Sequence, residues 1–212
     1  MSRRTRTPAT NPTTTSSPAD RRDRALTLHE SVTRTLAEWR PPDPHQARRR
    51  AGFLDHLERN PAGVWRECHP DHITASTLVV SSDLTRVLLT LHRRIRRWLQ
   101  TGGHCESGDH TLAAAALREA REETGIAELS VDPVPVQLSR HDVPCGPVRP
   151  AHHLDVQHVA VAPDGSREVV SAESLDLRWF RVDELPPGCD DITRELVRRS
   201  LRRLTDTRYP AH

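Results

Sequence analysis

The sequence predicts an α/β fold with mixed strands, preceded by an N-terminal helical extension. Runs rich in Val, Leu and Ile alternate with segments of helical periodicity, which is typical of sheets covered by helices. Hydrophobic residues make up 35% of the 212 residues and aromatic residues 3%, so we expect one modest core rather than two. We therefore divide the chain into a disordered polar tail (1–22), a helical extension (23–66) and an α/β domain (67–206).

The first 22 residues are dominated by Thr, Pro and Ser, which are too polar to bury a core and therefore predict disorder. Arg3 and Arg4 resemble the start of a twin-arginine signal, but no apolar segment follows them, which argues against secretion. Two helices are predicted over residues 24–39 and 45–59, separated by prolines. We expect both helices to pack on the α/β domain or against another subunit.

Strands are predicted where β-branched and apolar residues cluster between turn residues. The segments 73–80 and 86–92 form a predicted hairpin around Ser-Ser-Asp, and 97–100 leads into a pair of glycines. Further strands are expected near 128–138, 152–162 and 177–181. An amphipathic helix over 190–204, with apolar residues inward and arginines outward, follows the last strand.

The helix predicted over residues 111–124 is the main indication of function. Its start is expected near Thr111 or Asp109, and Gly125 is expected to end it. Its apolar positions are filled by Leu112 and by alanines. These small side chains permit close packing on a sheet.

Three carboxylates share one face of this helix, because Glu119, Glu122 and Glu123 are spaced at i, i+3 and i+4. Like charges at this spacing destabilise a helix unless a cation lies among them. Mg²⁺ prefers oxygen ligands and completes its shell with water and substrate phosphate. The sequence therefore predicts metal-assisted chemistry on a phosphate, with Mg²⁺, or alternatively Mn²⁺, as the cofactor.

Residues 103–126 resemble the signature of the Nudix hydrolases, a superfamily that cleaves diphosphates linked to another moiety. The family pattern is Gly, five residues, Glu, seven residues and then Arg-Glu-apolar-x-Glu-Glu-x-Gly-apolar. Its second half is matched from Arg118 to Ile126. In the first half, Asp109 stands in place of the first Glu, and the spacer from Asp109 to Arg118 is one residue longer. Either Asp109 or the nearby Glu106 is therefore expected to serve as the first acid.

The resemblance implies a Nudix-type α/β/α sandwich with a mixed sheet, so that residues 67–206 form a Nudix hydrolase domain. It implies that Glu119, Glu122 and Glu123 are the metal ligands. Arg118 matches the arginine that, in the family, orients a glutamate by ion pairing and does not itself react.

Gly103 and Gly125 match the family's loop and helix-end glycines, which need small or left-handed backbone geometry. The resemblance leaves the general base open, because family members use different acids. One candidate is Glu122 or Glu123 on the helix, and the other is Glu173, just before the last expected strand. Glu122, Glu123 and Glu173 are therefore the expected catalytic residues.

Four arginines, including Arg94 and Arg97, lie in the predicted turn before the glycines. The guanidinium group binds phosphate in a bidentate way, so both are candidates for substrate contact. The alternative for this cluster is a solvated hairpin tip.

Histidines occur in Cys68-His69-x-x-His72, His104-Cys105 and His152-His153. None of these spacings matches a standard zinc site, which favours surface and strand-edge packing for them.

The resulting hypothesis is a metal-dependent hydrolase that splits a nucleoside diphosphate linked to another moiety, with a small nucleotide or diphosphate as its partner. The altered first acid motivates one rival hypothesis, a catalytically inactive Nudix-fold domain that binds a ligand or regulates. An isomerase of the same fold would need a catalytic cysteine motif that Cys68 and Cys105 do not provide. The identity of the diphosphate substrate stays open.

Charge and composition limit the remaining classes. The net charge of +2 gives no global basic surface for nucleic acid, and no apolar run approaches the ~18 residues of a membrane span. Four widely spaced cysteines are typical of a reducing compartment, so a cytoplasmic protein is expected. Because dimers are frequent in the superfamily, a homodimer is one candidate assembly.

Overall fold

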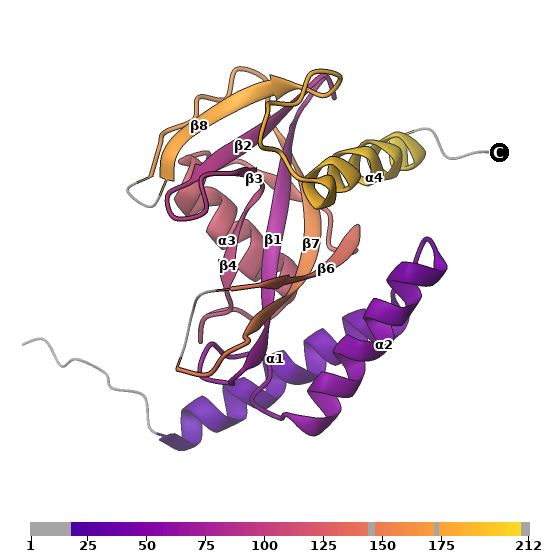
Figure 1. The fold of residues 1–212 in the computed structure, drawn as a ribbon, viewed down its shortest axis with the longest axis vertical. Helices are drawn as coiled ribbons and strands as arrows, with labels where there is room; N and C mark the ends of the chain where they lie inside the picture. Colours follow the sequence, from indigo (N-terminus) through magenta and orange to yellow (C-terminus); the bar gives the residue numbers. More distant parts are fainter. Residues whose placement is uncertain (1–17, 144–146, 172–173, 209–212) are drawn as a thin grey trace, which may run out of the picture.

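The computed structural model describes residues 18–143, 147–171 and 174–208. In this part of the chain, eight strands form one mixed sheet. Helix α3 covers one face of the sheet and α4 the other, while α1 and α2 lie side by side at the end where β1 begins (Figure 1). The layers are thus helix, sheet and helix, as predicted.

Two long strands form the middle of the sheet. β1 (Asp71–Ser81) and β7 (His152–Ala162) run parallel and pair along their whole length. Both are buried over nearly all of their residues, because helices cover both faces. The other strands are β2 (Arg86–His92), β3 (Trp98–Leu99), β4 (Thr101–His104), β5 (Ser130–Val131), β6 (Gln137–Asp142) and β8 (Ser174–Arg181).

The outer strands are antiparallel to their neighbours. β1 pairs with β2 and β4, and β2 also pairs with β3 and β8. On the other side, β7 pairs with β5 and β6. This pairing brings β4, which carries the glycine pair, directly beside β1.

Most of the expected strands are confirmed, with two differences. The strand expected near 128–138 is two short strands, β5 and β6. Pro133 and Pro135 lie between them, and proline lacks the N–H group that a continuous ladder needs. The strand expected at 177–181 begins earlier, at Ser174.

The N-terminal helices α1 (Pro18–Glu38) and α2 (Pro44–Arg59) share a core with the sheet. Leu36 of α1 and Leu57 of α2 belong to the same buried cluster as Ile73 of β1. The side chain of Gln46 joins α2 to β6, because it donates to Leu138 O and accepts from Leu138 N. The helices therefore pack on the α/β domain, the first of the two expected arrangements.

The predicted tail is only partly covered by the structure. Residues 1–17 lie outside the described part, and α1 begins at Pro18, within the segment expected to be disordered.

Asp43 caps α2, because its Oδ1 accepts from Gln46 N at 2.9 Å, and Pro44 occupies the first turn.

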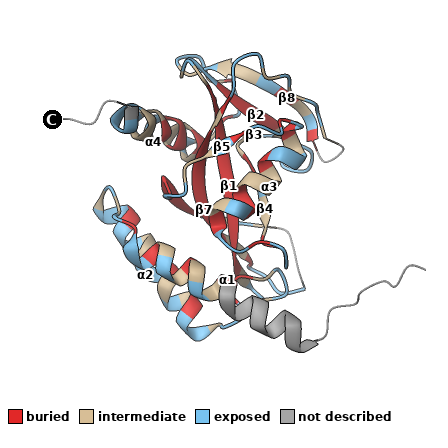
Figure 2. Cartoon of the chain, turned by 180° about the vertical axis from the view of Figure 1, so that it is seen from behind, coloured by how far each residue is buried: buried red, intermediate tan, exposed pale blue. Residues whose placement is uncertain are grey.

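Helices α3 (Leu112–Thr124) and α4 (Asp191–Arg208) bury their apolar sides on opposite faces of the sheet. Leu112, Ala115, Ala116 and Ala120 are buried in α3, as predicted. Figure 2 shows the buried residues gathered in the sheet and on the inner sides of the helices. Among the described helices, none is long and apolar enough to cross a membrane.

Candidate functional site

Helix α3 has the ends that its sequence predicts. The side chain of Thr111 accepts a hydrogen bond from Ala114 N at 3.1 Å and so caps the N-terminus. Gly125 ends the helix in the left-handed conformation, with φ 70°, and its N–H donates to Arg121 O. Thr111, rather than Asp109, is therefore the cap, which leaves Asp109 for another role.

The glycine pair of β4 lies directly against two of the glutamates. A Cβ atom on Gly103 would lie 2.6 Å from Cδ of Glu119, closer than atoms in contact allow. The amide N–H of Gly102 donates to Oε1 of Glu123 at 2.8 Å. Glycine is needed at 103 for this close approach, and the backbone of β4 thereby positions both carboxylates.

Arg118 ties the acidic side chains together. Its guanidinium donates to carboxylate oxygens of Asp109, Glu119 and Glu122, each at 3.0 Å. It also donates to the backbone carbonyl of His104 at 2.9 Å. The arginine thus fixes the orientation of two of the predicted metal ligands, Glu119 and Glu122, relative to β4.

The structure separates the two candidates for the first acid. The Asp109 side chain is only 5% exposed, and both of its oxygens accept from Arg118. Asp109 Oδ2 also accepts from the backbone N–H of Glu106, which closes the loop between β4 and α3. The Glu106 side chain is 67% exposed and lies 3.8 Å from Arg118. Asp109 therefore holds the arginine, and Glu106 is peripheral.

The charges at the site are unbalanced. Burial raises the pKa of Glu119, Arg118 opposes this shift, and the neighbouring carboxylates of Glu122 and Glu106 raise the pKa further. Burial disfavours the charge of Arg118, but Asp109 and Glu119 outweigh it and raise the pKa of Arg118. One guanidinium faces several carboxylates, so an added cation would stabilise the ionised site.

The donor set fits a hard divalent cation. Glu119, Glu122 and Glu123 offer carboxylate oxygens, which are the ligands that Mg²⁺ and Mn²⁺ prefer. Mg²⁺ is commonly held by one or two carboxylates together with water and substrate phosphate. A cation at Glu119 or Glu122 would share these side chains with Arg118.

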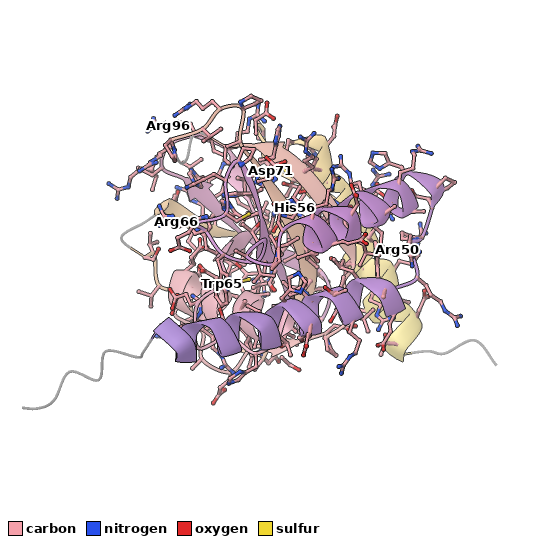
Figure 3. All side chains as sticks on the ribbon, turned by 90° about the horizontal axis from the view of Figure 1, so that it is seen from below. Arg50, His56, Trp65, Arg66, Asp71 and Arg96 are labelled. Carbon is pink, nitrogen blue, oxygen red and sulfur yellow. The ribbon has the colours of Figure 1, made fainter. Side chains whose placement is uncertain are left out.

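The predicted substrate-binding arginines lie on the turn between β2 and β3. Arg94 is exposed there, and Arg97 lies 3.8 Å from Asp190, just before α4. Figure 3 shows their neighbour Arg96 at the periphery of the molecule. The turn is solvated in this structure, and the contact of Arg94 and Arg97 with substrate stays a prediction.

Glu173 lies outside the described residues. The loop before it packs on the end of α3, because Val169 N donates to Thr124 O at 2.7 Å and Val169 lies against Gly125. Glu168 in this loop accepts from Trp179 Nε1 at 3.0 Å. The catalytic role of Glu173 stays a prediction.

Sequence reasoning missed a polar strip on the sheet face that α4 partly covers. Asp155 of β7 is buried there and accepts from Thr74, Ser76 and Gln157 at 2.8–3.0 Å. The signal was the alternation of polar residues in β1 and β7, which in a fully buried strand marks one polar face.

Comparisons with known proteins agree with this geometry. The family model described as the NUDIX domain matches residues 70–200, so α1 and α2 lie outside the matched part. No curated protein sequence matches the chain.

Several solved structures share the fold. A hydrolase of the NUDIX family from Clostridium perfringens is 22% identical, with a TM-score of 0.53, and covers 63% of this chain and 97% of its own. A C. elegans Ap4A hydrolase complex is 16% identical, with a TM-score of 0.54, and covers 63% of this chain and 97% of its own. The E. coli dihydroneopterin triphosphate pyrophosphohydrolase is 17% identical, with a TM-score of 0.52, and covers 62% of this chain and 95% of its own. At these identities the likeness shows the fold alone, and it confirms the predicted sandwich.

Proposed function

The chain belongs to the Nudix family, and from this premise we propose that it is a metal-dependent hydrolase of a diphosphate bond. The substrate class is a nucleoside diphosphate linked to another moiety. The observation that carries the proposal is the network in which Arg118 orders Glu119 and Glu122, while the Gly102 amide holds Glu123. These contacts keep three carboxylates in place before any ligand binds.

Glu119, Glu122 and Glu123 would hold the divalent cation, Mg²⁺ or alternatively Mn²⁺. When bound, such a cation neutralises charge on phosphoryl oxygens and lowers the pKa of the attacking water. The buried carboxylate of Glu119, whose pKa burial raises, is the ligand that would gain most from it.

Arg118 and Asp109 are proposed as positioning residues. Charge-assisted hydrogen bonds fix a carboxylate more firmly than neutral ones, so Arg118 limits the motion of Glu119 and Glu122. Asp109 in turn fixes Arg118 through two of its nitrogens. Fixed groups need little reorganisation during the reaction, which is the main source of catalysis in phosphoryl transfer. The shorter acid and longer spacer therefore keep the pairing, which supports an active enzyme over an inactive binding domain.

Three acids remain proposed as general base, and their surroundings differ. Glu122 is 59% exposed and reaches solvent, where an attacking water would come from. Glu123 is held by Gly102 N–H. Glu173 lies outside the described residues and is proposed from its place in the sequence, just before β8. Separate Gln substitutions at the three positions distinguish them, because loss of the base lowers kcat at a saturating metal concentration.

Arg94 and Arg97 are proposed to contact substrate phosphates from the β2–β3 turn, because exposed guanidinium groups bind phosphate in a bidentate way. Two proteins of similar structure, an Ap4A hydrolase and a dihydroneopterin triphosphate pyrophosphohydrolase, support a substrate with linked phosphates.

A substrate panel tests the proposal. The purified chain is incubated with nucleoside diphosphate derivatives and Mg²⁺, and products are separated and quantified. We expect cleavage of one class of compound by the wild type and by Glu58→Gln, an exposed glutamate on α2. The cleavage rate of Glu123→Gln should be lower than that of the wild type by about 100-fold or more, as expected for a group that orders the reacting centre. Absence of cleavage across the panel, with tight binding of one compound, would instead favour the inactive binding domain.

A further inference from the structure

Three histidines from three neighbouring strands converge at the end of the sheet where β1 begins. His72 lies in β1 opposite His153 of β7, and His104 of β4 lies opposite Thr74 of β1. Because residues 72 and 74 point to the same face, all three imidazoles lie on one side of the sheet. One ligand atom from each ring lies within 4.8 Å of the other two.

The rings contact one another closely. The ring centroids of His72 and His104 are 5.1 Å apart, those of His72 and His153 are 5.0 Å apart, and those of His104 and His153 are 4.9 Å apart. His141 of β6 adjoins the cluster, with its ring 5.5 Å from that of His153. The burial of several polar imidazole rings side by side requires a physical explanation.

Two nitrogens of this cluster are buried with no partner in the described protein. His72 is 1% exposed, and its Nδ1 lies 3.1 Å from the carbonyl oxygen of Cys68. A proton on Nδ1 makes that hydrogen bond and leaves a bare lone pair on Nε2, which has no partner. Nε2 of His104 is also buried without a hydrogen-bond partner among the described residues. Unpaired buried polar atoms destabilise a fold, so these two nitrogens would be stabilised by a ligand that binds both.

We propose that His72, His104 and His153 form a binding site for a transition metal ion, with Zn²⁺ as its occupant. Neutral imidazole nitrogen is a preferred ligand of Zn²⁺, and three histidines with an open fourth position form a known type of zinc site. Zinc-bound histidines usually donate their other N–H to a carbonyl or carboxylate, which is what Cys68 O provides for His72. Zn–N bonds of about 2.0–2.1 Å require the rings to close on the ion by roughly 1 Å.

The electrostatics of the cluster favour the ligating form. Burial, together with the neighbouring rings, lowers the pKa of all three histidines, to about 4 for His104. They are therefore neutral at pH 7 with their lone pairs available. Two exposed charges flank the cluster on the loop before β1, Arg66 and Glu67. Figure 3 looks at the molecule from below, with Arg66 labelled on this loop.

This site is distinct from the acidic helix but connected to it. Gly103 faces Glu119, so the next residue in the strand, His104, faces the other side of the sheet. The carbonyl of His104 accepts from Arg118, the residue that orders the glutamates. An ion held by His104 would therefore fix the end of β4 that supports Arg118. The nitrogen ligands select zinc, whereas the oxygen ligands of α3 select Mg²⁺.

Direct metal binding tests the proposal without reference to hydrolysis. The full chain without a histidine tag is stripped with a chelator and dialysed against Zn²⁺ in excess Mg²⁺, which saturates the carboxylate ligands. We expect one Zn²⁺ per chain and a rise in Tm with Zn²⁺. His104→Gln and His153→Gln should each weaken zinc binding at least about 10-fold and abolish the rise in Tm. Two matched variants, His45→Gln on the exposed surface of α2 and Glu119→Gln on α3, should bind zinc as the wild type does.

The possible results separate clearly. Zinc binding that survives both histidine substitutions, or that is lost in Glu119→Gln instead, overturns the proposal. If a histidine variant does not fold, the spectrum of wild-type protein loaded with Co²⁺ decides. Intense visible absorption, typical of four-coordinate cobalt, supports the site, and the weak spectrum of hydrated cobalt overturns it.

Discussion

Replacing Gly103 with Ala would separate the positioning of Glu119 from the stability of the fold. The new Cβ would lie 2.6 Å from Cδ and Oε1 of Glu119, whereas ordinary contacts begin near 3.4 Å. The Glu119 carboxylate must therefore move by about 1 Å, and a displacement of this size at a reacting centre costs about 100-fold in rate. We expect kcat/KM with Mg²⁺ to fall by that factor in Gly103→Ala.

The fold should tolerate the same substitution. The group displaced is the end of a side chain, and alanine reduces the entropy of the unfolded chain relative to glycine. The free energy of unfolding should therefore change by less than about 1 kcal/mol. Gly108→Ala is the matched control, because Gly108 lies in the loop that follows β4 and a Cβ there meets nothing within 4 Å. Steady-state kinetics and urea unfolding measure both effects. Full activity in Gly103→Ala would refute the claim that β4 positions Glu119.

Asp109→Ala should lower the free energy of unfolding by about 2–3 kcal/mol in urea denaturation, because it leaves Arg118 without its buried partner, whereas Glu106→Ala should change it by less than about 1 kcal/mol. An equal loss in both variants would contradict the assignment of Asp109. Stability should fall as pH drops from about 6.5 through 4, because the unfolded chain binds protons at histidines such as His104 that the folded chain keeps neutral, and His104→Gln should flatten this slope. A slope unchanged by that substitution would be evidence against a buried neutral His104. Leu57→Ala should lower the free energy of unfolding by about 2–5 kcal/mol, because Leu57 lies in the core that α2 shares with the sheet. Unfolding should remain a single transition, with its midpoint at a lower urea concentration. Two separate transitions would show that the helices and the sheet fold independently.

Local signals in the sequence predicted most of the fold. The bounds of β7 match the expected strand 152–162, and α3 begins at the Thr111 cap and ends at Gly125. These features depend on residues close in sequence, such as a cap or a left-handed glycine. The break between β5 and β6 also has a local cause, Pro133, although the pattern of apolar residues predicts one strand there.

Contacts between distant segments could not be read in the same way. The signature located the acids, but only the structure shows that Asp109 rather than Glu106 holds Arg118, because both lie in one irregular loop. The histidine cluster has no sequence spacing of its own, since its members come from three strands whose register becomes visible only in the folded sheet. Spacing rules describe ligands on one or two local elements, so such a site escapes them.

Carboxylates of α3 are proposed to hold a divalent cation for diphosphate hydrolysis. The most direct measurement is product formation by chelator-treated protein as Mg²⁺ is added, with the best compound of the panel. We predict a rate that rises from near zero and saturates with Mg²⁺ in the wild type, and that stays near zero in Glu123→Gln. A rate independent of divalent cations, or equal in the wild type and Glu123→Gln, would show that these carboxylates do not hold a catalytic cation.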